Sequence, residues 1–167
     1  DRPYVSSSFL SVAIAQVYGT ALSGICKDRP QLVEQTIPLE AIITALPCRG
    51  GEAVLHSLFE PLGYTLTAER QQLDTQFPEW GESAYFNVTL THTLRLTDLL
   101  SHLYVLIPVL DDDKHYYVGD DEVAKLLRHG EGWLREHPQK EVIAQRYLKH
   151  LHRLKHAALS QLADNPA

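Results

Sequence analysis

The feature that most constrains the fold is a long alternation of apolar and polar residues over Tyr85–Leu96. Phe86, Val88 and Leu90 share one face of an extended chain, and an asparagine and three threonines share the other. Because successive side chains of a strand point to opposite faces, this period predicts a half-buried β-strand. One apolar strand face must be packed against other elements, so the rest of the chain has to supply neighbouring strands and covering helices.

Two further segments have the character of strands. Ile37–Leu46 is apolar, rich in β-branched residues and bounded by prolines, and Tyr64–Glu69 alternates. Gln71–Ser83, which contains the run FPEWG, is predicted to be a loop. Helical spacing predicts five helices, at Phe9–Leu22, Glu52–Leu62, Leu99–Ile107, Val123–Leu127 and Glu141–Leu162. The expected class is α+β, with an antiparallel or mixed sheet of three or more strands packed with about five helices.

Three of these helices carry detailed predictions. Phe9–Leu22 has no charge and is apolar almost all round, so we expect a buried core helix that stops at Gly24. Thr97 or Asp98 is predicted to cap the helix that follows the main strand, and Pro108 to end or kink it. The helix that begins after Asp121 is expected to end at Gly130, followed by a short helical element within residues 132–137.

The domain organisation is predicted as two parts. Residues 1–138 would form the α+β core, and residues 139–167 a C-terminal helix and the start of a linker. The chain of 167 residues contains no methionine, so we expect a fragment or a processed form of a longer protein. Its formal net charge of −6 argues against non-specific binding to nucleic acids or membrane surfaces. Cys26 and Cys48 are expected to be free thiols.

A strongly acidic segment is the principal candidate site. Six carboxylates fall within twelve residues and only Lys114 opposes them: Asp111, Asp112, Asp113, Asp120, Asp121 and Glu122. The spacing partly fits a calcium loop, but Tyr116 stands where that loop needs glycine. A structural interpretation makes the later carboxylates caps of the next helix and the remainder a solvated turn.

Two functional interpretations of this segment stay open. Carboxylates beside tyrosines are suited to contact a basic protein partner, which gives the candidate binding residues Asp111, Asp112, Asp113, His115, Tyr116 and Tyr117. Alternatively, Asp111–Asp113 and His115 hold a transition metal, which would make the chain a small metal-dependent enzyme.

A basic run over Arg146–His156 gives a further alternative. It is expected to be a solvated helix face, on which His152 and His156 lie four residues apart. The functional alternatives are a metal held by these two histidines or a weak RNA-binding surface. No glycine-rich dinucleotide loop, P-loop, GxSxG elbow or HExxH helix occurs, so no catalytic residue or metal ligand is assigned. Whether the chain is itself an enzyme stays open.

Three stretches resemble a known family. Residues 1–16 (DRPYVSSSFLSVAIAQ), 77–81 (FPEWG) and 103–121 (LYVLIPVLDDDKHYYVGDD) are similar to the N-terminal region of the bacterial Hen-type RNA 3′-terminal ribose 2′-O-methyltransferases. This resemblance covers nearly the whole chain. It implies a parent protein whose C-terminal half, absent here, is the methyltransferase that uses adenosylmethionine and a divalent metal, manganese or magnesium.

The resemblance also implies a role for the N-terminal half. That half is expected to bind the bacterial polynucleotide kinase-phosphatase-ligase and to switch on its ligase in RNA repair, without a cofactor of its own. RNA would be met through the assembled hetero-oligomer, in the cytoplasm and away from membranes. None of the methyltransferase half's cofactor or metal residues has a counterpart in this chain.

Overall fold

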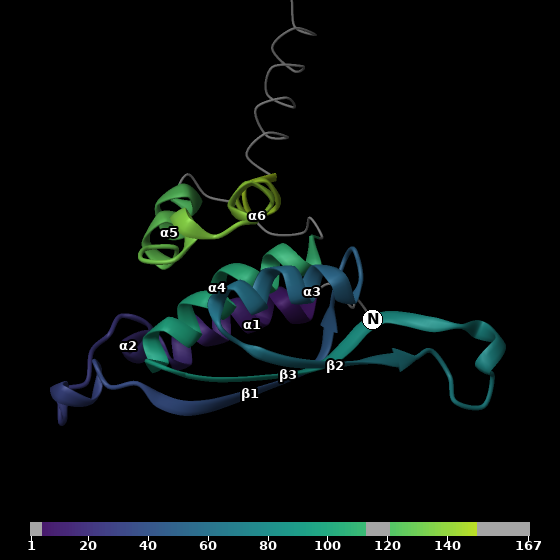
Figure 1. Ribbon diagram of the computed structural model, residues 1–167, viewed down its shortest axis with the longest axis horizontal. Helices are drawn as coiled ribbons and strands as arrows, with labels where there is room; N and C mark the ends of the chain where they lie inside the picture. The colour runs from purple at the N-terminus through teal and green to yellow at the C-terminus, as the bar shows by residue number, and fades with distance from the viewer. Residues whose placement is uncertain (1–4, 113–120, 150–167) are drawn as a thin grey trace, which may run out of the picture.

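The fold is built on a three-stranded antiparallel sheet. The computed structural model describes residues 5–112 and 121–149. Within them the strands lie in the order β1-β3-β2, with bounds β1 Ile37–Pro47, β2 Thr65–Gln72 and β3 Glu82–Leu94 (Figure 1). The alternating stretch of the sequence forms the central strand β3, which places Phe86, Val88 and Leu90 in the core at 1% exposure or less. The three predicted strands are confirmed.

Helices cover one face of this sheet. The longest described helix, α4, spans Leu96–Asp111 and packs beside α1, Val5–Val17, over the strands (Figure 1). The others are α2 Gly19–Leu22, α3 Glu52–Phe59, α5 Glu122–His129 and α6 Lys140–Tyr147, with 3₁₀ turns at Pro30–Leu32, Glu60–Leu62, Pro78–Trp80 and Leu134–Glu136. The α+β prediction is confirmed. No described helix is long and apolar enough to cross a bilayer.

The central position of α4 explains its sequence. It contacts β1 and α1 on the side of the sheet, and α5 and α6 on its outer side. A helix covered from both sides buries residues all round, and Val105, Leu106 and Val109 are fully buried. On the other face of the sheet, no described helix covers β1, and Ile42 is 66% exposed.

Both detailed predictions for α4 need correction. Arg95 is the N-cap residue, and neither Thr97 nor Asp98 forms a capping hydrogen bond within the described chain. Instead Arg95 holds the Asp98 carboxylate at 2.9 Å, and the Thr97 hydroxyl donates to the carbonyl of Leu22 at 3.1 Å. The helix continues past Pro108 to Asp111, so this proline does not end it, and the alternative of a kink at Pro108 stays a prediction.

The first helix differs from its prediction in length and burial. The helix is interrupted at Tyr18, which separates α1 from α2. Helix α2 ends before Gly24, which has a φ of +67°. Ile14 is buried, but Val12 is 49% exposed and Val17 71% exposed. The prediction of an entirely buried helix is wrong, because α1 packs on α4 with one side and no described element covers the other.

The segment predicted as a loop at residues 71–83 is a loop at residues 73–81 and continues the two strands at either end. Strand β2 continues to Gln72 and β3 begins at Glu82, and these two residues pair across the strands. An ion pair between Arg70 and Glu82 at 2.9 Å supports the pairing. Only the tip, residues 73–81, lies outside the strands, and it contains the 3₁₀ turn Pro78–Trp80.

The C-terminal helix packs on the same core. Helix α6 contacts α4, and Ile143 of α6 is fully buried. The predicted helix Glu141–Leu162 is therefore present from residue 140 to 147, and its later part lies outside the described residues. The domain boundary near residue 138 stays a prediction.

Candidate functional site

The acidic segment begins at the C-terminal end of α4. Asp111 is buried there at 5% exposure, and Asp112 follows as the C-cap residue with φ +45°, in the left-handed region. The other predicted binding residues, Asp113, His115, Tyr116 and Tyr117, lie outside the described residues. The structure thus describes where this segment is attached.

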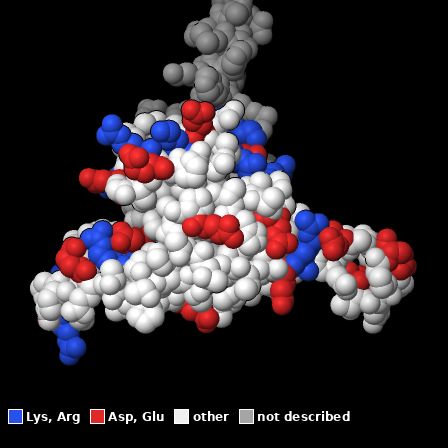
Figure 2. All heavy atoms as spheres, viewed as in Figure 1, with Lys and Arg blue, Asp and Glu red and all other residues white. Residues whose placement is uncertain are grey.

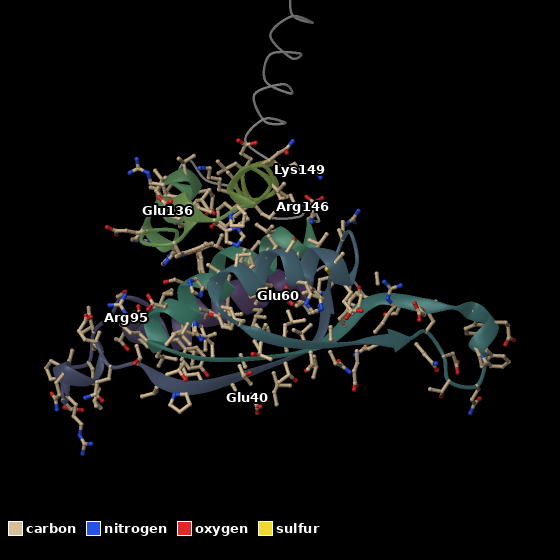
Figure 3. The ribbon with its side chains drawn as sticks, viewed as in Figure 1. Glu40, Glu60, Arg95, Glu136, Arg146 and Lys149 are labelled. Atoms are coloured by element: carbon tan, nitrogen blue, oxygen red, sulfur yellow. The ribbon has the colours of Figure 1, made fainter. Side chains whose placement is uncertain are left out.

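Three cationic side chains hold this attachment point, which we call the acidic corner (Arg49, Asp111, Asp112, Arg146 and Lys149). Arg49 donates through Nε to the Asp111 carbonyl at 3.2 Å, and Arg146 donates to the carbonyls of Arg49 and Val109 at 3.0 and 3.3 Å. Lys149 lies 3.0 Å from both carboxylate oxygens of Asp112 (Figure 3). The last carbonyls of a helix lack partners within it, so these donors complete the end of α4.

The segment re-enters the described structure at the start of α5. Lys125 lies 2.8 Å from Glu122 and 3.1 Å from Asp121, and the hydrogen bond to Glu122 raises the pKa of Lys125. The Tyr147 hydroxyl donates to Glu122 at 3.2 Å. Asp121 is the N-cap residue but makes no capping hydrogen bond within the described chain, because Lys125 engages its carboxylate. The capping prediction for Asp121 is therefore wrong.

The two ends of the segment are both held by the C-terminal part of the described chain. Lys149, just after α6, contacts Asp112 at one end, and Tyr147 of α6 contacts Glu122 at the other, where Lys125 of α5 also pairs with Glu122. These contacts neutralise part of the negative charge that the sequence concentrates here. Asp111 and Asp112 anchor the segment through these contacts, and their role in partner binding stays a prediction.

The described residues supply no further ligands for the predicted metal site. Among residues 5–112 and 121–149, no group of three or more histidine, cysteine, aspartate or glutamate side chains is arranged to hold a metal. Asp113, His115, His152 and His156 lie outside that part. The metal site and the RNA-binding surface thus stay predictions.

Sequence analysis missed a set of histidines in the core. His102 of α4 is 6% exposed and lies 2.7 Å, through Nδ1, from the Tyr64 hydroxyl. Burial lowers the pKa of His102 to about 4 and raises that of Tyr64. The ring of Trp133 packs edge-on against His102 at 5.0 Å, and the Trp133 indole donates to the His129 carbonyl at 2.7 Å. A histidine so enclosed serves packing and hydrogen bonding, since no substrate can reach it.

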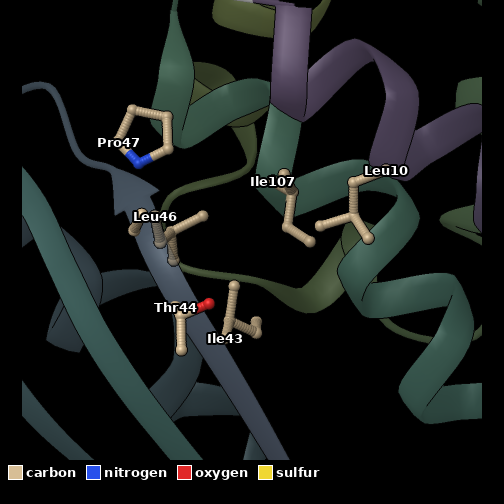
Figure 4. Close-up of a pocket in the computed structure, with 7 residues that line it drawn as sticks. Leu10, Ile43, Thr44, Leu46, Pro47 and Ile107 are labelled. Atoms are coloured by element: carbon tan, nitrogen blue, oxygen red, sulfur yellow. The ribbon is translucent and has the colours of Figure 1, made fainter. Parts of the chain in front are cut away.

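A small pocket lies between α1, α4 and the end of β1. It is lined by Leu10, Ile43, Thr44, Ala45, Leu46, Pro47 and Ile107 (Figure 4). Its volume of about 60 Å³ is the space of roughly two water molecules. The β1 strand bulges here, and Ala45, at φ +53°, donates its N–H to the Asn87 side chain at 3.2 Å. The pocket is a packing defect beside this bulge and is too small for a cofactor.

Replacing Arg146 by alanine is expected to lower the free energy of unfolding by about 1–2 kcal/mol, because two carbonyls at the acidic corner lose a charged donor. Denaturation by urea measures this change. Arg128→Ala is the matched control, since Arg128 is an exposed arginine of α5 and its loss should change stability by less than about 0.5 kcal/mol. Equal stability of the two variants would contradict the bracing role of Arg146.

The family of the chain is given by comparison with known proteins. A family model described as the RNA repair, ligase-Pnkp-associating region of Hen1 matches residues 1–163. A search of curated proteins finds no match. The resemblance drawn from three short stretches of sequence is thereby confirmed, and the match extends over all the described elements. The chain belongs to the family of RNA-repair, ligase-Pnkp-associating regions of Hen1.

Proposed function

We propose that this chain is a non-catalytic module that binds the bacterial polynucleotide kinase-phosphatase-ligase and raises the activity of its ligase. The observation that carries this proposal is the family match over residues 1–163, whose description names association with ligase-Pnkp. A bound protein raises an enzyme's activity when it binds the active conformation more tightly than the inactive one. An activation of 100-fold, for example, requires about 2.7 kcal/mol of such differential binding.

The acidic segment between the two anchors is the proposed contact. Lys149 pairs with Asp112 before this segment, and Lys125 pairs with Glu122 after it. Tyr116 and Tyr117 provide rigid amphipathic side chains, and the neighbouring carboxylates complement a basic surface.

The parent protein completes the proposed assembly. Its absent C-terminal half would be the RNA ribose methyltransferase and would hold adenosylmethionine with manganese or magnesium. RNA would reach this module only as part of the assembled hetero-oligomer, which we place in the cytoplasm. An acidic chain with a net charge of −6 is consistent with indirect contact to RNA, since direct contact needs clustered cations.

The test is a ligase adenylation assay titrated with the chain. Ligase activity should rise and saturate. Replacing Tyr116 and Tyr117 together by alanine should raise the concentration of chain needed for half-saturation by about tenfold or more, as expected for central interface aromatics. Tyr18→Ala is the matched control, because Tyr18 is a 50% exposed tyrosine distant in sequence from the segment, and its loss should change nothing.

The outcomes separate the two parts of the proposal. No rise in ligase activity at saturating wild-type chain contradicts the activating function as a whole. A rise that the double tyrosine variant reproduces at the same concentration contradicts only the assignment of the contact to the acidic segment.

A further inference from the structure

A two-stranded arm projects from the body of the molecule. Strand β1 ends where Pro47 pairs with Tyr85, and beyond this point β2 and β3 alone continue to the pair Gln72 and Glu82, from which the loop of residues 73–81 extends. We call residues 71–84 the arm. Figure 1 shows it extending past the helices that cover the rest of the sheet. The arm contributes only Ser83 to the buried residues, so its length is not explained by packing of the core.

The tip of the arm exposes an ordered aromatic pair. The rings of Phe77 and Trp80 stack with centroids 4.7 Å apart and 14° between their planes. The 3₁₀ turn Pro78–Trp80 holds them, with the Trp80 N–H donating to the Phe77 carbonyl at 3.0 Å. Phe77 is 42% exposed, Trp80 59% and the nearby Leu73 58%. A preformed pair loses little entropy on binding, and tryptophan is among the residues most often essential to protein interfaces.

The arm carries only negative charge. Asp74, Glu79 and Glu82 lie on it, and residues 71–84 include no lysine or arginine. Arg70, at the base of the arm, pairs with Glu82, which leaves Asp74 and Glu79 beside the aromatic pair. Figure 2 shows acidic side chains on the projecting end of the molecule. The tip therefore complements an apolar pocket with a basic rim.

The same charges argue against other occupants. Exposed aromatic rings can stack on RNA bases, but the carboxylates of Asp74 and Glu79 would repel the phosphates. The described pocket near Leu10 and Ile107 has a volume of about 60 Å³ and cannot admit an indole ring, and self-association through the arm is an outcome of the test below.

We propose that the arm docks on the ligase-bearing partner by inserting Phe77 and Trp80 into an apolar pocket that lysine or arginine side chains surround. This contact is additional to the acidic segment of residues 113–120 and lies at the opposite end of the strands from the start of β1. It rests on the proposed function, since that function supplies the partner. The arm contributes affinity for the partner and fixes the position of the chain on it. The acidic segment remains the proposed activating contact.

The test measures binding of the full chain to the full-length kinase-phosphatase-ligase by isothermal titration calorimetry. The double variant Phe77→Ala/Trp80→Ala should bind at least about 30-fold more weakly than wild type, as the loss of a central aromatic pair predicts. The charge variant Asp74→Lys/Glu79→Lys should bind at least about fivefold more weakly at low salt, with the difference shrinking as salt is added. Ile42→Ala, which removes another exposed apolar side chain, should bind within twofold of wild type.

Each result bears on one proposal. If wild type does not bind the partner, the proposed function fails and the arm proposal fails with it. If wild type binds and both arm variants bind equally well, only the arm proposal is overturned. Arm-dependent self-association in sedimentation, or arm-dependent binding to single-stranded RNA, also overturns it. Thermal unfolding checks the fold of the aromatic variant, and the charge variant, which keeps both rings, decides the matter if that variant unfolds.

Discussion

Lowering the pH from 6.5 to 4 is expected to remove about 3 kcal/mol of folding free energy through His102 alone. Burial holds the pKa of this histidine at about 4 in the folded chain, whereas an unfolded histidine titrates near 6.5. Between these values the unfolded chain takes up a proton that the folded chain refuses. The stabilising contribution is therefore complete above pH 6.5 and is lost as the pH falls toward 4.

The surroundings of His102 explain the size of this effect. Burial is the largest cause and lowers the pKa of His102. His92 and His137 lower this pKa further, and Asp98 raises it. His129 acts in the same direction, since burial lowers its pKa as well. His56 opposes them, because its hydrogen bond with Glu60 raises its pKa and stabilises the fold at low pH, and solvent screens this contribution since the side chain is 34% exposed.

Urea unfolding at a series of pH values between 4 and 8 measures the effect. The control is Tyr64→Phe/His102→Phe, which removes the titrating ring together with the hydroxyl that it would leave without a partner. This variant should lose much less stability between pH 6.5 and 4 than wild type, retaining mainly the slope from His129. Parallel pH profiles for the two proteins would show that His102 does not govern acid unfolding.

The parts of the fold that sequence predicts are those where periodicity records burial. Phe86, Val88 and Leu90 alternate because β3 has one buried face, so both the strand and its core residues follow from the sequence. Helix α4 gives less information of this kind. Most of its residues are buried, so burial leaves no clear period in the sequence. His102 lies within the apolar run of this helix, and hydrophobic spacing alone does not predict that a histidine there is buried.

Two of the remaining errors involve ion pairs between residues three and four positions apart in sequence. Asp98 pairs with Arg95 instead of capping α4, and Asp121 pairs with Lys125 instead of capping α5. The arm was predicted as a loop because proline and glycine punctuate its tip, although the strands on either side continue to Gln72 and Glu82. For the acidic segment, sequence supplied the composition, and the structure added the cations that anchor its ends.

Removing the buried side chain of Ile143 is expected to destabilise the whole fold. Ile143→Ala should lower the free energy of unfolding by about 2–4 kcal/mol, since the side chain is fully buried and its loss leaves a cavity between α6 and the core. The better helix propensity of alanine recovers only about 0.4 kcal/mol of this. Val142→Ala is the control on the same helix, where the half-buried valine should cost about 1 kcal/mol or less.

This variant also tests where the core ends. If residues 139–167 form a separate part, loss of Ile143 will leave the unfolding of β3 and α4 unchanged. We expect instead one cooperative transition at lower urea concentration, because Arg146, Tyr147 and Lys149 of the same segment hold the end of α4 and the start of α5. Tryptophan fluorescence from Trp133 and far-ultraviolet circular dichroism should report the same midpoint. Two separate midpoints would place the boundary near residue 138, and a single one would make the C-terminal helix part of the module that the ligase-bearing partner meets.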